Sequence, residues 1–154
     1  MTAPSHDSRH LSAYARFFAM LALSFLAMYV LMYAMVDTTA NVYNNINKVY
    51  MAGLMAMPMG VVELVLMARM YPDRRLNAIL LGACAVLGGL FWFAIRTQAG
   101  VTDQQFLRSM IPHHAGAILM CRRTTLGDPD LQRLCAQIVE SQQREIDEMK
   151  AKLR

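Results

Sequence analysis

Three long apolar runs constrain the fold of this chain more than any other feature. Residues 17–36 and 76–95 each hold 20 consecutive residues without a charge, and residues 49–70 form a third run that contains Glu63 and Arg69. At about 1.5 Å per residue, a helix of ~20 apolar residues crosses the ~30 Å hydrocarbon core of a bilayer. The sequence therefore predicts three transmembrane helices, over about residues 14–36, 49–70 and 76–96.

The composition supports this interpretation. Only 17% of the 154 residues are charged and 56% are hydrophobic, whereas about a quarter of the residues in soluble domains are charged. These values exclude a disordered chain, a disulfide-dense secreted mini-protein and an ordinary soluble enzyme. The net charge of +4 comes mostly from arginines beside apolar runs, which indicates membrane orientation rather than nucleic-acid binding.

The first apolar run is typical of a signal anchor rather than a cleaved signal peptide. Its 20 residues exceed the roughly 7–15 apolar residues of a signal peptide. Five Lys and Arg residues lie at run ends on the side of the amino terminus, and three lie on the opposite side. The positive-inside rule therefore predicts a cytoplasmic amino terminus and an external carboxyl-terminal part. The counted residues are Arg9, Arg16, Arg69, Arg74 and Arg75 against Lys48, Arg96 and Arg108.

The carboxyl-terminal part has a different composition, since 15 of residues 99–154 are charged. Thr102 and Gln105 fit a capping box that begins one helix, and residues 127–130 form a turn before a second helix. The sequence predicts an all-α chain with a membrane domain over residues 1–98 and an extramembrane αα-hairpin over residues 99–154. One hairpin buries little apolar surface, so we expect a second copy to complete a bundle. One face of the first hairpin helix would carry Phe106, Met110, His113, His114, Ala117 and Cys121.

A cluster of soft metal ligands lies on this first hairpin helix. Met110, His113, His114, Met120 and Cys121 fall within three helical turns. Thioether sulfur favours Cu(I), and imidazole accepts Cu, Zn, Fe or Ni. The alternative is that the histidines are hydrogen-bonded core residues and the methionines are ordinary packing residues. Spacing alone leaves both interpretations open.

Proline interrupts the same helix. Pro112 has no N–H, so the backbone carbonyl of Arg108 loses its intrahelical partner and we expect a kink. A kink beside two histidines would change the direction of their side chains.

Folding the hairpin about Asp128 brings together residues whose numbers sum to about 256. This register places Cys121 opposite Cys135 and His114 opposite Gln142. The two cysteines fit a disulfide, a metal–thiolate site or two buried thiols. An external location permits the disulfide, which we rank first.

The membrane section contains a second candidate site. Glu63 is the only carboxylate well inside a predicted span, and such a group is a functional-site hypothesis by default. Methionines recur every four residues around it, so Met55, Met59 and Glu63 could bind a soft cation. The alternative is that the methionines pack between helices and that Glu63 hydrogen-bonds a tyrosine such as Tyr29 or Tyr33.

The sequence offers no catalytic constellation. The predicted spans contain no histidine that could hold haem, and the chain has no Cys-x-x-Cys-His motif. The Glu-x-x-His pattern of di-iron bundles and the Gly-rich nucleotide motifs are also absent. We therefore expect a binding protein rather than an enzyme.

The hairpin resembles a known family. Asp103-x-x-Phe106, the run FLRSMIPHHAGAILMC, the DPDL turn and Ile138-x-x-x-Gln142-x-x-Glu145-Ile146-x-x-Met149 are similar to the domain-of-unknown-function 305 family over about residues 102–153. The preceding MYVLMYAMVD and YMAGLMAMPM resemble its membrane-anchored relatives. The resemblance implies a ferritin-like helical bundle that binds Cu(I) or Ag(I) in the bacterial periplasm. Soluble members commonly carry two hairpins, so the resemblance implies that this chain supplies half of a bundle. Cys121 and Cys135 are not part of the family's general pattern.

The resemblance also implies a site and a function. We expect a bacterial inner-membrane protein for copper buffering, tolerance or trafficking, with Cu(I) as the first candidate metal and Ag(I) or Zn as others. The expected partners are membrane lipid, a second copy and periplasmic copper-handling proteins, without nucleic acid. A structural or oligomerisation module without metal and a thiol–disulfide redox device stay open as alternatives. The expected ligands are Met110, His113, His114, Met120 and Met149, with Gln142 and Glu145 orienting the histidines.

Overall fold

The computed structural model describes residues 6–153, and every regular element in that range is helical. The predicted all-α fold is therefore confirmed. Residues 1–5 and 154, which the predicted domains include, lie outside the described residues. The α-helices are α1 (His6–Leu31), α2 (Ile46–Leu66), α3 (Arg74–Thr97), α4 (Asp103–Arg123) and α5 (Pro129–Lys152), and the short 3-10 helices are η1 (Met32–Met35), η2 (Thr39–Asn41) and η3 (Ala68–Met70).

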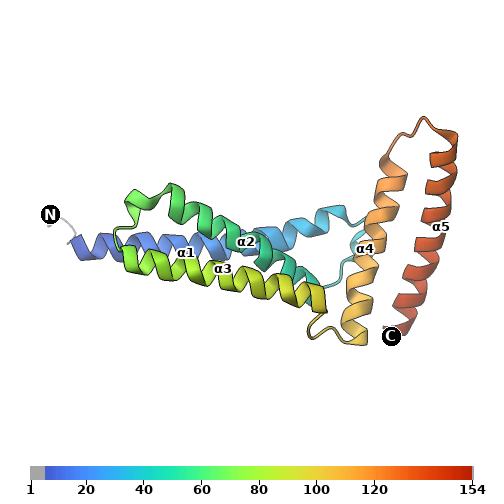
Figure 1. Cartoon of the computed structure of the whole chain (residues 1–154). Helices are drawn as coiled ribbons and strands as arrows, with labels where there is room; N and C mark the ends of the chain where they lie inside the picture. Colours follow the sequence, from blue (N-terminus) through green and yellow to red (C-terminus); the bar gives the residue numbers. More distant parts are fainter. Residues whose placement is uncertain (1–5, 154) are drawn as a thin grey trace. The chain divides into compact units, whose positions relative to one another are not determined.

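The first of two compact units contains residues up to Val30 and residues 49–99. Its helices α1, α2 and α3 run side by side (Figure 1). Ala13–Met35, Ile46–Leu66 and Arg74–Thr97 are long and apolar enough to cross a membrane, by length and composition. Many of their large apolar side chains, such as Leu23 and Trp92, are more than half exposed in the single chain.

Small residues allow α2 to approach the other helices of this unit. A Cβ atom built on Gly53 would lie 2.5 Å from a ring carbon of Phe91 in α3. A Cβ atom on Gly60 would lie 3.0 Å from Sγ of Cys84. Because glycine lacks this atom, the helices pack at a separation that a larger residue would prevent.

Glu63 has a tyrosine partner, which is neither Tyr29 nor Tyr33. The hydroxyl of Tyr71 donates to Oε1 of Glu63 at 2.9 Å. Tyr71 is only 3% exposed; burial, and then the hydrogen bond and charge of Glu63, raise the pKa of Tyr71 to about 12. The Tyr71 carbonyl accepts a hydrogen bond from Asn77 at 2.7 Å. Glu63, in the last turn of α2, is therefore hydrogen-bonded to a residue of the connection between α2 and α3.

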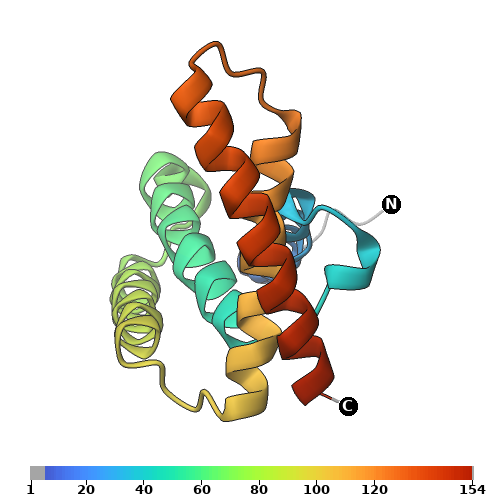
Figure 2. The same ribbon diagram turned by 90° about the vertical axis from the view of Figure 1, so that its right-hand side faces the viewer.

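The second unit combines residues 31–48 with residues 100–154. Helix α4 packs against α5 on one side and also contacts η1 and η2; Figure 2 views the hairpin with α5 in front of α4. The sequence assigns residues 31–48 to the membrane domain. Their contacts place them in the same compact unit as the hairpin. The centre of this unit consists of Ile111, Ala115, Ile118 and Ile146, all with 0% exposure.

A side-chain cap begins each hairpin helix, but Oε1 of Gln105 accepts from the Ile46 N–H at 3.0 Å instead of completing the predicted capping box. Oγ1 of Thr102 accepts a hydrogen bond from the Gln105 N–H at 3.4 Å, at the beginning of α4. Oδ1 of Asp128 accepts one from the Asp130 N–H at 2.7 Å, at the beginning of α5. Each side chain satisfies a backbone donor that has no partner within its own helix.

The carbonyl released by Pro112 finds a donor outside the helix. Nδ2 of Asn45 donates to the Arg108 carbonyl oxygen at 3.3 Å and to the Tyr43 carbonyl oxygen at 3.2 Å. Oδ1 of Asn45 accepts from the Lys48 N–H at 3.0 Å, at the beginning of α2. One side chain, 5% exposed, therefore joins residues 43–48 to α4 at the point where proline interrupts the helical hydrogen bonds.

The single apolar face predicted for α4 is only partly correct. Phe106 is 52% exposed and His113 is exposed, whereas His114 is buried. A Cβ atom on Gly116 would lie 3.4 Å from the carbonyl oxygen of Met35 in η1. Because α4 is covered by α5 and by residues 31–48, its buried surface extends beyond one stripe. The buried residues are Ile111, Pro112, His114, Ala115, Gly116 and Ile118.

Candidate metal site

Four of the predicted metal-site residues line one cavity between α4 and α5. Met110 and His114 lie one helical turn apart on α4, and Glu145 and Met149 lie one turn apart on α5. The cavity has a volume of about 240 Å³. It brings together two thioether groups, one imidazole and one carboxylate from two antiparallel helices.

His114 is fixed at both ring nitrogens. Its Nδ1 lies 2.9 Å from the Met110 carbonyl oxygen, and its Nε2 lies 2.7 Å from Oε2 of Glu145. A carbonyl oxygen can only accept, so Nδ1 carries a hydrogen and donates it. Nε2 of a neutral ring with this tautomer and a carboxylate oxygen both accept, so their 2.7 Å contact requires a hydrogen on one of the two atoms. That hydrogen would have to leave before the Nε2 lone pair could bind a metal.

The burial of the two partners differs. The side chain of His114 is 8% exposed and that of Glu145 is 51% exposed. The imidazole is held inside the hairpin while the carboxylate reaches solvent. A proton leaving Nε2 consequently has a direct route to water through the Glu145 carboxylate.

An ion pair forms part of the cavity wall. Nζ of Lys152 lies 2.9 Å from Oε1 of Glu148, and both side chains are more than 60% exposed. The hydrogen bond and the charge of Lys152 lower the pKa of Glu148. Both residues line the cavity, and neither was predicted as a site residue from the sequence. An i, i+4 acid–base pair near the end of a predicted helix would have been the signal.

The other predicted ligands lie elsewhere. His113 is exposed, and its ring centroid lies 6.0 Å from that of His114. Met120 is 56% exposed and does not line the cavity. Gln142 does not line it either, and the hydrogen-bond partner of His114 is Glu145. Met55, Met59 and Glu63 all lie in α2, in the first unit.

Methionine sulfur is the donor type that would complete a metal site in this cavity. Within residues 6–153, no group of three or more His, Cys, Asp or Glu side chains could hold a metal ion. His114 and Glu145 supply one nitrogen and one carboxylate, and the thioethers of Met110 and Met149 are the other two predicted donors that line the cavity. This donor set is suited to a soft ion rather than to Mg²⁺ or Ca²⁺.

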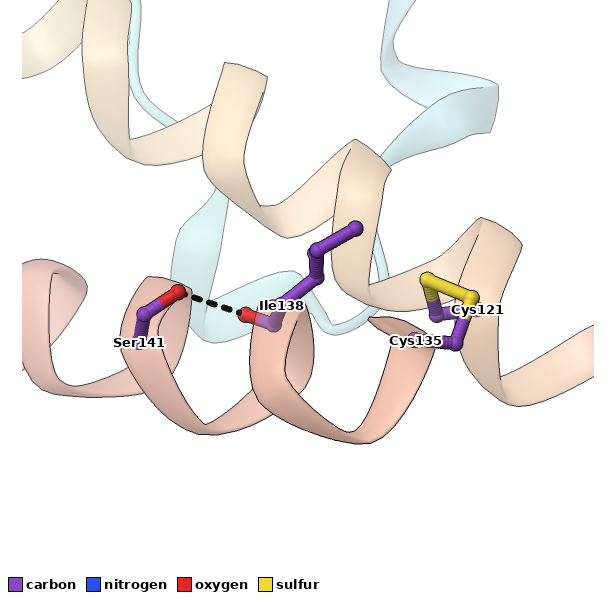
Figure 3. Close-up of a disulfide and its surroundings, with 4 residues drawn as sticks. All are labelled: Cys121, Cys135, Ile138 and Ser141. Atoms are coloured by element: carbon purple, nitrogen blue, oxygen red, sulfur yellow. Dashed lines mark hydrogen bonds between the residues drawn. A yellow bond between two sulfur atoms is a disulfide. The ribbon is translucent and has the colours of Figure 1, made fainter. Parts of the chain in front are cut away.

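Cys121 and Cys135 form a disulfide between α4 and α5 (Figure 3). Their Cα atoms lie 5.2 Å apart, as the register about Asp128 predicts. The bond lines a separate cavity of about 620 Å³. A disulfide sulfur is not a thiolate, so in this state neither cysteine serves as a thiolate ligand.

Comparison with known proteins gives a relative and a family match. A segment of 61 residues, 37% of this chain, is 49% identical to "Uncharacterized protein L153" of Acanthamoeba polyphaga mimivirus. The match covers 39% of the length of that protein. No solved structure matches the chain. The predicted family resemblance is confirmed for the hairpin, because residues 94–153 match the family described as "Domain of unknown function (DUF305)".

Proposed function

We propose that this protein is a membrane-anchored metal-binding protein whose α4–α5 hairpin holds a soft monovalent ion, with Cu(I) as the first candidate. The observation that carries the proposal is the cavity lined by Met110, His114 and Met149. Two thioethers and one imidazole from facing helices form a donor set that favours Cu(I) and Ag(I).

The same donor set argues against Zn²⁺ as the preferred ion. Protein zinc sites use thiolate, imidazole and carboxylate ligands, and thioether sulfur from Met110 and Met149 would be half of the donors here. Glu145 would balance the positive charge of a bound ion or orient the imidazole of His114. The hairpin would therefore distinguish copper from zinc by ligand softness.

The proposed role is to hold copper and hand it over. We place the protein in a bacterial inner membrane, with the amino terminus cytoplasmic and the hairpin periplasmic. The length and composition of the three apolar helices and the distribution of Lys and Arg support this placement. The expected partners are membrane lipid and periplasmic copper-handling proteins.

We also propose that a second copy covers the outer surface of the hairpin. Leu131 and Leu134 on α5 are 47% and 49% exposed, and Met120 on α4 is 56% exposed. Pairing two hairpins would bury these side chains and produce a four-helix bundle of the ferritin-like type. Crosslinking of the purified protein as a dimer would support this part of the proposal.

The test is Cu(I) affinity, measured anaerobically on the full chain in detergent by competition with a chromogenic Cu(I) chelator. Met110→Leu and Met149→Leu keep the side-chain volume but remove sulfur. Each should weaken Cu(I) binding by about tenfold or more. Met120→Leu is the matched control and should leave the affinity unchanged, because Met120 does not line the cavity. Equal affinity in all four proteins would contradict the proposal.

His113 and His114 can be distinguished in the same assay. His114→Gln should remove a ligand, whereas His113→Gln should retain Cu(I) affinity close to that of the parent protein. Equal losses would indicate a site that uses both histidines, as the sequence prediction has it, rather than the cavity alone.

A structural role for the hairpin is the second candidate. The observation that favours it is that both ring nitrogens of His114 already have protein partners. In that case His114→Gln would lower the melting temperature by the same amount with and without Cu(I). A melting temperature that rises with Cu(I) in the parent protein but not in His114→Gln would exclude this alternative.

A further inference from the structure

A second polar cavity lies in the same unit and shares no lining residue with the candidate metal site. Its volume is about 360 Å³, within the range of small-molecule sites. Arg108 of α4 and Lys150 of α5 contribute two positive charges to it, and Ala40, Tyr43 and Leu153 complete the lining. Ala40 of η2 and Tyr43 after it thus form one wall, and the hairpin forms the other.

Among residues 6–153, neither cation forms a described ion pair. The described ion pairs of this unit join other residues, and no side-chain hydrogen bond engages Arg108 or Lys150 in the part of the chain that the structure describes. Two like charges that face one cavity repel each other, and a dianion between them would replace this repulsion with two attractions.

The walls of this cavity are held in place before any ligand binds. The Asn45 amide donates to the carbonyl oxygens of Tyr43 and Arg108, which both line the cavity. Tyr43 and Leu153 also pack against the buried isoleucine cluster. A ligand would therefore meet a formed site, with little ordering cost beyond the two long side chains.

We infer that this cavity binds a phosphate-class anion through Arg108 and Lys150. The planar guanidinium of arginine matches two oxygens of a phosphate, and the lysine ammonium adds a point charge. The ligand can come from two sources, a free phosphate compound or the headgroup of an anionic phospholipid.

Chain connectivity makes a lipid headgroup reachable. Ala40 follows the end of the first apolar segment, Met35, by five residues, and Tyr43 precedes α2 by three. Five extended residues span at most about 17 Å, which is comparable to the thickness of a headgroup layer. The lipid source rests on the proposed membrane location, whereas the anion site itself depends on neither that location nor the metal site.

The experiment uses the full chain in a non-ionic detergent at fixed salt. Binding of inorganic phosphate is measured by calorimetry. Retention of phosphatidylglycerol against phosphatidylcholine is measured by native mass spectrometry after extraction from nanodiscs that contain both lipids. Arg108→Gln and Lys150→Gln should each weaken binding by about tenfold or more. Arg122→Gln is the matched control, an exposed arginine on the same helix that lines neither cavity.

Each outcome decides the inference. Phosphate binding that both site variants weaken supports a soluble ligand, and selective retention of phosphatidylglycerol that both variants abolish supports a lipid. Failure of both probes, or an equal loss in Arg122→Gln, overturns the site. Lys150→Gln, in the last turn of α5, carries the test if Arg108→Gln does not fold. Cu(I) affinity should stay unchanged in both variants, so failure of this inference is distinguishable from failure of the proposed function.

Discussion

The hydrogen bond from Asn45 to the Arg108 carbonyl, which Pro112 leaves without a helical donor, gives the sharpest test of the folded structure. Asn45 supplies two kinds of hydrogen bond. Its Oδ1 accepts from the Lys48 N–H at the beginning of α2, and its Nδ2 donates to the Arg108 carbonyl that proline leaves without a helical partner. Asn45→Ala removes these two bonds and the local bond from Nδ2 to the Tyr43 carbonyl, whereas Asn45→Ser retains an oxygen that can accept from the first turn of α2.

The magnitude follows from the geometry of each bond. Loss of a side-chain acceptor at a helix beginning costs about 1 kcal/mol. The bond to the Arg108 carbonyl is partly buried and, at 3.3 Å, longer than usual, so its loss costs about 1 kcal/mol, at the low end for a carbonyl without a partner. Asn45→Ala should therefore destabilise this unit by about 2 kcal/mol and Asn45→Ser by about 1 kcal/mol.

Pro112→Ala separates the two effects. Alanine restores an N–H at position 112, which can donate to the Arg108 carbonyl within α4. In the Pro112→Ala background, Asn45→Ser should then cost about 1 kcal/mol less than in the parent chain. This coupling arises only if the asparagine amide replaces the donor that proline lacks.

The assay is native-state hydrogen exchange of the purified full chain, which reports the free energy of local opening for peptides from residues 43–50 and 108–118. Gln104→Ala, at an exposed position in the first turn of α4, serves as the control and should leave both peptides unchanged. Additive effects of Asn45→Ser and Pro112→Ala, within about 0.5 kcal/mol, would refute the reasoning.

Two further predictions concern the hairpin. Replacing Cys121 and Cys135 by serine opens a link over 14 residues and should cost about 3 kcal/mol, measured by thermal unfolding in oxidising and reducing buffer. Because Lys152 lowers the pKa of Glu148, their contribution to stability should be present above the ordinary pKa of glutamate and lost as the pH falls through the lowered value. Lys152→Gln should return the carboxyl pKa, followed by NMR titration, toward its usual value.

The sequence predicts the helices of the hairpin and its disulfide because these depend on local signals. Capping at Thr102, the turn at Asp128 and a simple fold-back register suffice to bring Cys121 and Cys135 together. The same register pairs His114 with position 142, one helical turn away from its observed partner, Glu145. A register along the chain does not determine the rotation of α5 about its own axis, which depends on the packing of the buried isoleucines.

The role of residues 31–48 could not be predicted in this way. Residues 31–36 belong to the first predicted span, and residues 37–48 are rich in Asn and Thr, which is typical of a surface loop. Its position depends on partners far along the chain, such as Arg108 for Asn45 and Gln105 for the Ile46 N–H. Pro112 indicates that a carbonyl needs a donor, but the sequence does not identify which of many polar side chains supplies it.

The second unit is built from two segments that lie far apart in the chain, and this has a consequence for biosynthesis. The partner of Asn45 is synthesised 63 residues later, which corresponds to roughly 3–12 s at ordinary rates of translation. During that interval residues 31–48 have no α4 to bind, and their asparagine side chains can remain hydrogen-bonded to water. The polar composition of residues 37–48 is thus compatible with exposure to water until the last third of the chain has been synthesised. The candidate metal cavity and the cavity of Arg108 and Lys150 both include residues of α5, so they form only at the end of synthesis.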